Sequence, residues 1–258
     1  MGKTEKLELP HREDFYFRDK NGGEIPHQFE SLTRNFLREI WQSDSEELDK
    51  KRVNYALKLA VKSHAGQFRR ERNLPYSVHP IEAAFRALRD GRSASFLVWL
   101  LLHDTREDTW IRFKNRTFVR ELFSGTVTEL VTRLLSRFRL VQNSKTGKSE
   151  LVKIPDEKYA ENLRSSHSAV KAKHFDTFSN LCSDGRRLDE CLEVASDEAR
   201  KTIVDIKKFI VQTREFLLPI QSDFYREQKA ETEEIILKIE TRIQIVETFL
   251  AQNEAHDF

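Results

Sequence analysis

The 258-residue sequence has little cysteine and no large surplus of charge of either sign. Its two cysteines, Cys182 and Cys191, offer neither a disulfide framework nor the spacing of zinc ligands. We therefore expect a protein of a reducing compartment, with the cytoplasm as the default. The formal net charge of +2 gives no reason to expect bulk electrostatic capture by nucleic acid or by a membrane surface.

Signal peptides, membrane spans and sheet patterns are also missing. The N-terminus is charged and lacks the apolar region of a signal peptide. The apolar run over 96–102 is too short to cross a bilayer. Residues 147–149, Gly-Lys-Ser, are not a phosphate loop, because that motif requires a glycine where Gln142 stands. Since no stretch alternates polar and apolar residues for long enough to predict a sheet, we predict an all-α chain with a polar loop over 141–157.

Apolar residues recur at helical spacing along most of the chain. The predicted helices cover 29–41, 48–64, 81–88, 118–123, 127–135, 159–163, 169–181, 199–218 and 235–250. Ser43 and Glu46 have the spacing of a capping box ahead of the second helix. Pro80 is expected at the first position of the third helix, and Pro219 is expected to interrupt the helix over 199–218.

The last predicted helix carries an apolar stripe whose final spacing resembles heptads. Two heptads are too few to predict a coiled coil, so the pattern favours packing against the domain over dimerisation. A homo-oligomer formed through the C-terminal helices stays open. We divide the chain into an N-terminal extension with one amphipathic helix (1–44), a main domain (45–225) and a C-terminal helix (226–258).

The seven apolar residues over 96–102 are typical of a helix buried on all sides. They are followed by an imidazole and three carboxylates, those of His103, Asp104, Glu107 and Asp108. If the helix continues through them, His103 and Glu107 share one face, and Asp104 and Asp108 share the adjacent part of it. Such a buried end carries a heavy desolvation penalty unless a positive charge binds there, and a divalent cation meets that need. The dipeptide alone means little, because a second His-Asp occurs in the polar C-terminal tail.

Two further residues could complete a metal site. His79 lies 24 residues before His103, which allows two antiparallel helices to bring both imidazoles together. Asp176 and Asn180 lie one helical turn apart, and Asp176 would complete a set of two imidazoles and two carboxylates. That set suits manganese, iron or zinc. The alternative is that His79 caps a helix and that Asp176 and Asn180 are an exposed pair.

Gly66 ends the second predicted helix, and the loop behind it is basic. It carries Arg69, Arg70 and Arg72. Composition leaves two interpretations open: a solvated surface loop, or a site for phosphate or base.

Taken together, these segments resemble the Rel/SpoT-type alarmone hydrolases of the HD phosphohydrolase superfamily, over roughly residues 48–185. The resemblance rests on the order and spacing of four motifs, whereas any one of them is unspecific. They are His64-x-Gly-Gln-x-Arg-Arg, Pro75-Tyr-x-x-His79-Pro, Leu101-Leu-His103-Asp104-x-x-Glu107-Asp108-Thr109 and Lys173-x-x-Asp176-x-x-x-Asn180.

The resemblance implies an all-α HD-domain bundle that holds one divalent metal ion, manganese (Mn²⁺) in the first place. The implied metal ligands are His79, His103, Asp104 and Asp176. Glu107 and Asp108 match the acidic pair that handles the attacking water. Arg69 and Arg70 stand where the family contacts the guanine base and phosphates, and Asn180 where it contacts the nucleotide. His64 matches a position that is not a ligand.

The implied reaction is hydrolysis of the 3′-diphosphate of guanosine tetra- or pentaphosphate (ppGpp or pppGpp), which releases pyrophosphate. No segment remains for a synthetase domain, so we expect hydrolysis only. Two alternatives stay open. One keeps the site but acts on another nucleoside phosphate, and the other is a catalytically silent HD-fold interaction module that works through its long C-terminal helices.

Overall fold

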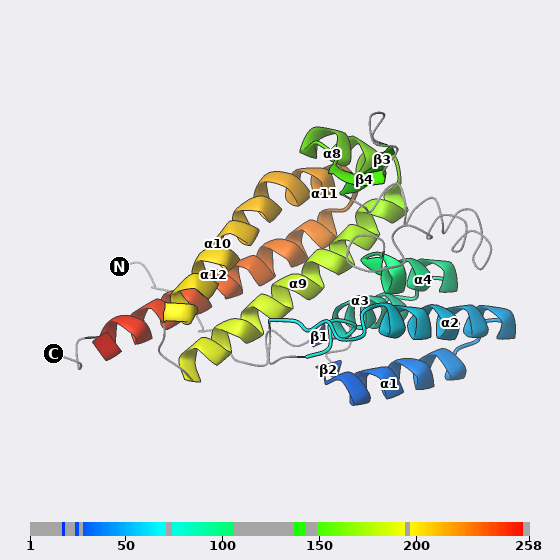
Figure 1. The fold of residues 1–258 in the computed structure, drawn as a ribbon, viewed down its shortest axis with the longest axis horizontal. Helices are drawn as coiled ribbons and strands as arrows, with labels where there is room; N and C mark the ends of the chain where they lie inside the picture. Colours follow the sequence, from blue (N-terminus) through cyan, green and yellow to red (C-terminus); the bar gives the residue numbers. More distant parts are fainter. Residues whose placement is uncertain are drawn as a thin grey trace, which may run out of the picture.

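In the computed structural model, residues 17–18, 24–25, 28–70, 74–105, 137–142, 149–193 and 197–254 are described, and helices dominate them (Figure 1). The helices are α1 (Phe29–Gln42), α2 (Glu47–Ser63), α3 (Val78–Arg89), α4 (Ala94–Leu102), α8 (Asp156–Arg164), α9 (His167–Glu193), α10 (Asp197–Gln212), the π-helix η4 (Thr213–Leu217), α11 (Leu218–Phe224) and α12 (Arg226–Glu254). Two short antiparallel ribbons accompany them, β1 (Phe17–Arg18) with β2 (Glu24–Ile25), and β3 (Phe138–Gln142) with β4 (Ser149–Lys153). The prediction of an all-α fold is confirmed.

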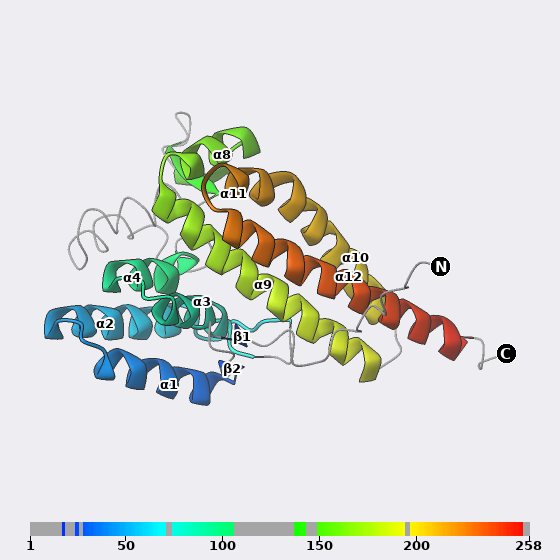
Figure 2. The same cartoon turned by 180° about the vertical axis from the view of Figure 1, so that it is seen from behind.

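Helix α9 is the axis of the bundle. It is 27 residues long and lies against α3 and α4 on one side and against α12 and α10 on the other (Figure 2). Side chains all round α9 are therefore buried, including polar ones. A helix with two packed faces can present chemical groups to two different environments, and α9 does so.

Helix α4 explains the apolar run of the sequence. All of residues 96–102 are buried, because α4 packs against α2, α3 and α9 at once. A helix surrounded in this way needs no polar face, so its sequence has no amphipathic period. Its C-cap residue is His103, which is thereby delivered into the interior.

The first and last helices pack into the same core. Leu32, Phe36 and Ile40 of α1 face α3, and the apolar stripe of α12 is buried against α9. The C-terminal stripe therefore packs within the molecule, as the sequence favoured. The divisions at 45 and 226 stay a prediction. None of the helices described is both long enough and apolar enough to cross a bilayer.

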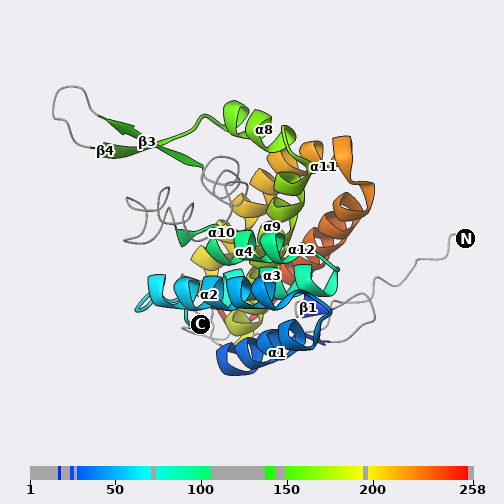
Figure 3. The same ribbon diagram turned by 90° about the vertical axis from the view of Figure 1, so that its right-hand side faces the viewer.

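The predicted loop over 141–157 is wrong in part, because β3 and β4 form a hairpin there and α8 begins at Asp156. Figure 3 shows the hairpin projecting from the helices. Val141 and Val152, which lie on the same face of this ribbon, are 36% and 39% exposed, so that face is not buried. Each strand is only five residues long, and an alternating pattern that short was not enough to predict a sheet.

Two predicted helix starts also need correction. Ser43 does not cap α2 but ends α1, donating its hydroxyl to the carbonyl of Ile40, and Glu46 is the N-cap of α2 without a side-chain bond. Helix α3 begins at Val78, so Pro80 is its third residue rather than its first. The first-turn amide groups of a helix have no partner within it, and the proline is tolerated for that reason.

The predicted helix over 169–181 is too short, and the break at Pro219 is milder than expected. Helix α9 continues to Glu193 through a stretch rich in buried polar residues, where the apolar period ends before the helix does. The π-helix carries the chain from α10 into α11, and Pro219 lies in the first turn of α11. The predicted helices over 118–123 and 127–135 lie outside the described residues.

Candidate metal centre and its adjoining cavity

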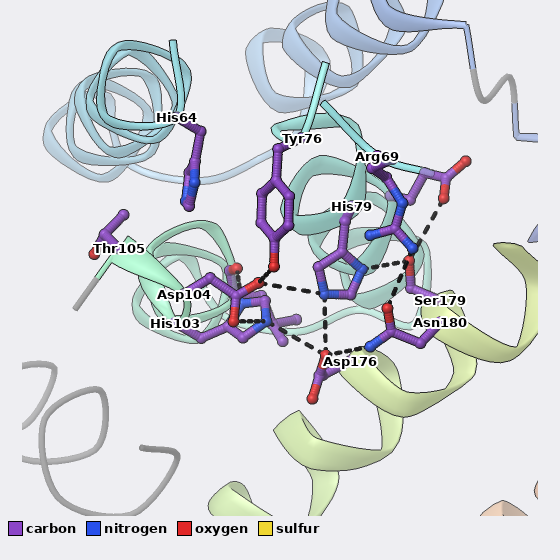
Figure 4. Close-up of polar contacts among 12 residues, drawn as sticks. His64, Arg69, Tyr76, His79, His103, Asp104, Thr105, Asp176, Ser179 and Asn180 are labelled. Atoms are coloured by element: carbon purple, nitrogen blue, oxygen red, sulfur yellow. Dashed lines mark hydrogen bonds and ion pairs between the residues drawn. The ribbon is translucent and has the colours of Figure 1, made fainter. Parts of the chain in front are cut away.

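Three helices bring two imidazoles and a carboxylate together in the interior (Figure 4). His79 comes from the first turn of α3, His103 from the end of α4 and Asp176 from the middle of α9. They are 1%, 7% and 7% exposed. One ligand atom from each lies within 4.8 Å of those of the other two, which is close enough to share a single metal ion.

Asp104, the fourth predicted ligand, lies beside both imidazoles. Its Oδ1 is 3.2 Å from His103 Nε2, and its Oδ2 is 3.6 Å from His79 Nε2. Asp176 Oδ1 is 3.0 Å from His79 Nε2 and 3.4 Å from His103 Nε2. The structure thus gathers all four residues, which we call the four-residue cluster, around the two Nε2 atoms.

Hydrogen bonding on the far side of the His103 ring shows that the cluster suits a cation. His103 Nδ1 is 2.7 Å from the carbonyl oxygen of Leu100. A carbonyl oxygen only accepts, so Nδ1 carries the hydrogen and Nε2 of the neutral ring presents a lone pair. That buried Nε2 has no hydrogen-bond partner among the described residues, yet it faces two carboxylates. A divalent ion bound by nitrogen and oxygen ligands fits this arrangement.

Charges around the cluster shift its pKa values strongly. Burial opposes the charged form of His103, but Asp104 and Asp176 outweigh burial and raise the pKa of this imidazole well above its ordinary value. Burial likewise opposes ionisation of Asp176, but the Lys173 ammonium and the two imidazoles hold its pKa well below the ordinary range. The pKa of His79 is lowered, chiefly by burial. Both carboxylates of the cluster are therefore favoured in their ionised form, and they attract to His103 Nε2 a positive charge that either a proton or a metal ion can supply.

Two residues that the sequence analysis left without a role hold the carboxylates. Lys173 Nζ lies 2.5 Å from Asp176 Oδ2, which leaves Oδ1 turned toward the imidazoles. Tyr76 donates its hydroxyl to Asp104 Oδ2 at 2.9 Å. The ring of His64 stacks on Tyr76 with centroids 4.7 Å apart, so His64 contacts the support of a ligand and lies outside the cluster. Both Tyr76 and Lys173 stand within the quoted motifs, which is where a role could have been sought.

Two of the predicted substrate-binding residues, Arg69 and Asn180, lie next to the four-residue cluster. Arg69 donates from Nη2 to Asn180 Oδ1 at 3.2 Å, and Asn180 donates from Nδ2 to Asp176 Oδ1 at 3.1 Å. A continuous set of contacts therefore joins the basic loop to the cluster. Arg70 lies farther out, with Nη1 3.0 Å from Asp205 Oδ2 of α10.

A cavity of about 470 Å³ opens beside the cluster. Tyr76 and Asn180 line the cavity and also hydrogen-bond to the cluster carboxylates Asp104 and Asp176, so they separate the cavity from the cluster. We call it the arginine-lined cavity. Its walls include Phe68, Arg69, Arg70, Asp184, Arg187 and Phe209. Phe68 is 63% exposed, which is unusual for so large an apolar ring and leaves its face free for stacking.

The predicted acidic pair, Glu107 and Asp108, lies outside the described residues, as does Arg72. Their roles stay predictions.

No protein-family model and no curated protein matches the sequence. A solved structure does match, under the description "A metazoan ortholog of SpoT hydrolyzes ppGpp and plays a role in starvation responses". The identity is 19% and the TM-score 0.52, and the match covers 76% of this chain and 97% of that one. At this identity the likeness establishes the fold, an HD-like helical bundle, and leaves the activity to be argued from the site.

Proposed function

We propose that the protein is a metal-dependent phosphohydrolase that removes the 3′-diphosphate of ppGpp or pppGpp as pyrophosphate. The observation that carries this proposal is the four-residue cluster, of which His79, His103 and Asp176 are buried, at the edge of the arginine-lined cavity. The shared fold with a protein described as hydrolysing ppGpp supports it. The resemblance of the four sequence motifs points the same way.

The four-residue cluster would hold one divalent ion. Its mixture of two nitrogen and two carboxylate ligands suits Mn²⁺, and also iron or zinc. When bound, the ion supplies Lewis acidity to a phosphoryl oxygen and lowers the pKa of the attacking water. Lys173 and Tyr76 keep the carboxylates oriented for it, each through one hydrogen bond.

Glu107 and Asp108 are proposed to handle the water. If the helix continues past His103, Glu107 follows one turn later on the same face and brings a carboxylate beside the cluster. A carboxylate there can hold the water and accept its proton, with Asp108 orienting it. This assignment rests on the sequence alone.

Spacing along α9 fits a nucleoside whose 3′ phosphates reach the cluster. Asp176, Asn180 and Asp184 follow one another at intervals of four residues, so the cluster carboxylate Asp176 and the cavity residue Asp184 lie about 12 Å apart along the helix. Arg69 would neutralise phosphate charge between them, and Arg70 would do so at the rim. Phe68 offers a stacking face for the base.

The Asp184 carboxylate favours guanine. Guanine carries two adjacent donors, N1–H and its amino group, whereas adenine pairs a donor with an acceptor on the corresponding edge. A carboxylate accepts from both guanine donors and repels the adenine ring nitrogen. Arg187 already donates to Asp184 Oδ1 at 2.9 Å, which orients that carboxylate but also occupies part of it. This shared engagement is why another nucleoside phosphate remains the second candidate.

A panel of nucleotides tests the proposal. The purified protein is incubated with Mn²⁺ and, separately, with ppGpp, pppGpp, GTP, dNTPs and NADPH, and the products are resolved by chromatography. We expect release of pyrophosphate from ppGpp and pppGpp, and little from the others. Faster turnover of a different nucleotide would transfer the function to that substrate, and no turnover of any would favour a silent interaction module. Asp184→Asn should narrow the preference for guanine over adenine nucleotides.

A further inference from the structure

A buried ion pair lies behind the metal centre and takes no part in the function proposed above. Glu82 of α3 and Arg186 of α9 are 1% and 2% exposed, and Arg186 donates from Nη2 to Glu82 Oε2 at 3.2 Å. Burial of two charges removes their hydration, and the attraction between them seldom gives a net gain in stability. The buried Glu82–Arg186 pair is therefore expected to have a role other than stabilising the fold.

Ser179 connects this pair to a metal ligand. Its hydroxyl is fully buried, 3.5 Å from Glu82 Oε2 and 3.0 Å from His79 Nδ1 (Figure 4 shows Ser179 and His79). A serine hydroxyl has one hydrogen to donate, and two arrangements of that hydrogen are conceivable. It points either to the carboxylate or to the imidazole.

Two carboxylates act on this choice in opposite directions: without a metal ion Asp176 Oδ1, 3.0 Å from Nε2, attracts the imidazole hydrogen to Nε2, whereas Glu82 acts on the Ser179 hydroxyl. An ionised carboxylate can only accept, and Arg186 keeps Glu82 ionised, so the Ser179 hydrogen turns toward Glu82. The Ser179 oxygen then accepts from His79, which requires the hydrogen on Nδ1. In the opposite arrangement the hydroxyl would donate to Nδ1, the imidazole hydrogen would move to Nε2, and the nitrogen that faces Asp176 could not bind a metal.

We propose that Arg186, Glu82 and Ser179 form a positioning line that holds His79 in its metal-binding tautomer, with Nδ1 protonated and Nε2 free. They are positioning residues, because they act through His79. His103 obtains the same result from the backbone carbonyl of Leu100. The inference rests on the metal site of the proposed function and is independent of the nucleotide.

Metal affinity of Ser179→Ala tests the line. Mn²⁺ binding is measured by calorimetry, without nucleotide, for the wild type, for Ser179→Ala and for Ser63→Ala. The last is a matched control, because Ser63 is also a buried helical serine but donates only to the carbonyl of Leu59, at 2.6 Å. Loss of an outer partner of a ligand weakens metal binding by about 10–100-fold, and we expect this for Ser179→Ala alone. Equal affinities for the two variants would overturn the inference.

A combined variant tests whether Ser179 acts together with the ion pair. Glu82→Gln and Arg186→Gln are introduced as a pair, so that no single charge is left buried. We expect weaker Mn²⁺ binding on the wild-type background and no further weakening on the Ser179→Ala background, since members of one line are not additive. Losses of Mn²⁺ affinity that add up in the combined variant would contradict the positioning line. Should the paired variant fail to fold, the comparison of Ser179→Ala with Ser63→Ala decides alone.

The outcome separates this inference from the proposed function. Metal binding that depends on Ser179, in a protein that hydrolyses none of the nucleotides, would uphold the positioning line and overturn the hydrolase. Hydrolysis of ppGpp by a protein whose metal affinity does not depend on Ser179 would uphold the hydrolase and overturn the positioning line. A wild type that binds no divalent ion would overturn both.

Discussion

The two faces of α9 bury histidines in opposite ways. Toward α3 and α4, Asp176 meets two imidazoles whose Nε2 atoms point at carboxylates. Toward α11 and α12, the ring of His174 is satisfied at both nitrogens. Gln221 donates from Nε2 to His174 Nδ1 at 3.1 Å, and His174 Nε2 lies 3.1 Å from Glu231 Oε2.

The difference shows that burial does not distinguish a metal ligand from a core residue. His174 is 2% exposed, within the range of the two candidate ligands. What separates them is the partner opposite each nitrogen: a donor faces one nitrogen of His174, whereas His103 Nε2 has only carboxylates before it. A ring with acceptors opposite both nitrogens must carry a second positive group at Nε2, either a proton or a metal ion, whereas a ring that faces one donor and one acceptor is satisfied in its neutral form.

The sharpest way to test this comparison is to alter one residue on each face. Asp176→Asn should lose stoichiometric metal and, with it, all hydrolysis, because a neutral amide is a poor substitute for a carboxylate ligand. His174→Gln should keep the metal and lose only stability. Metal content by mass spectrometry after desalting checks both variants. Metal retained by Asp176→Asn, or lost from a folded His174→Gln, would contradict the assignment of the two faces.

A smaller loss of activity is expected for Glu107→Gln. The amide keeps the shape and most hydrogen bonding of the side chain but cannot accept a proton. Metal content should therefore survive while kcat falls by about 10²–10⁴-fold, the usual contribution of a general base. Measured together, metal content and turnover distinguish a base from a ligand: a metal-free variant would make Glu107 a ligand, and a fully active one would leave it without a role.

A milder effect again is expected for Arg69→Ala at the cavity. Arg69 contacts Asn180 and lines the cavity, so it should contribute to nucleotide binding in the ground state and transition state alike. KM should then rise, by about 10-fold for one charge-assisted contact, with kcat nearly unchanged. Ala in place of Arg38, a residue of α1 distant from the cavity in sequence, serves as a control for the loss of one positive charge. If both variants left KM unchanged, the basic loop would be a solvated surface.

The sequence indicated most of the described helices and named the four residues of the cluster, for particular physical reasons; their role as metal ligands stays a prediction. The run over 96–102 could be recognised as buried because it has no polar face, and its abrupt end at His103 marked the site. Helices α1 and α12 were placed by a different feature, an apolar stripe on one side of an otherwise polar helix. The sequence could not indicate which residues of different helices contact one another in the core, because those contacts depend on how three helices pack.

The contacts missed by sequence analysis illustrate that limit. Ser179, Glu82 and Arg186 are ordinary helical residues until α3 and α9 are packed together, when the first meets His79 and the other two meet each other. The β3–β4 hairpin was missed because its strands are five residues each, too short for a clear alternating pattern. In the same way, nothing near His174 in sequence indicates that residues 47 and 57 positions later provide its partners.

The smallest expected effect concerns the pH dependence of stability on the α11–α12 side. Burial, with help from Arg86 and Lys171, holds the pKa of His174 well below its ordinary value. A depressed folded-state pKa means that the unfolded chain binds the extra proton, so this stability is complete above about pH 6.5 and is lost as the pH falls below that value. One pH unit below that value, the loss of unfolding free energy is about 1.4 kcal/mol, or roughly 3–6 °C in Tm for a chain of this size. His174→Gln has no such proton to bind. The Tm difference between wild type and variant should therefore shrink by that amount from pH 7.5 to 5.5, measured with a chelator present so that the metal site contributes equally to both. A difference that stays constant over this range would mean that His174 is not held neutral, and that the two faces of α9 are more alike than their hydrogen bonds indicate.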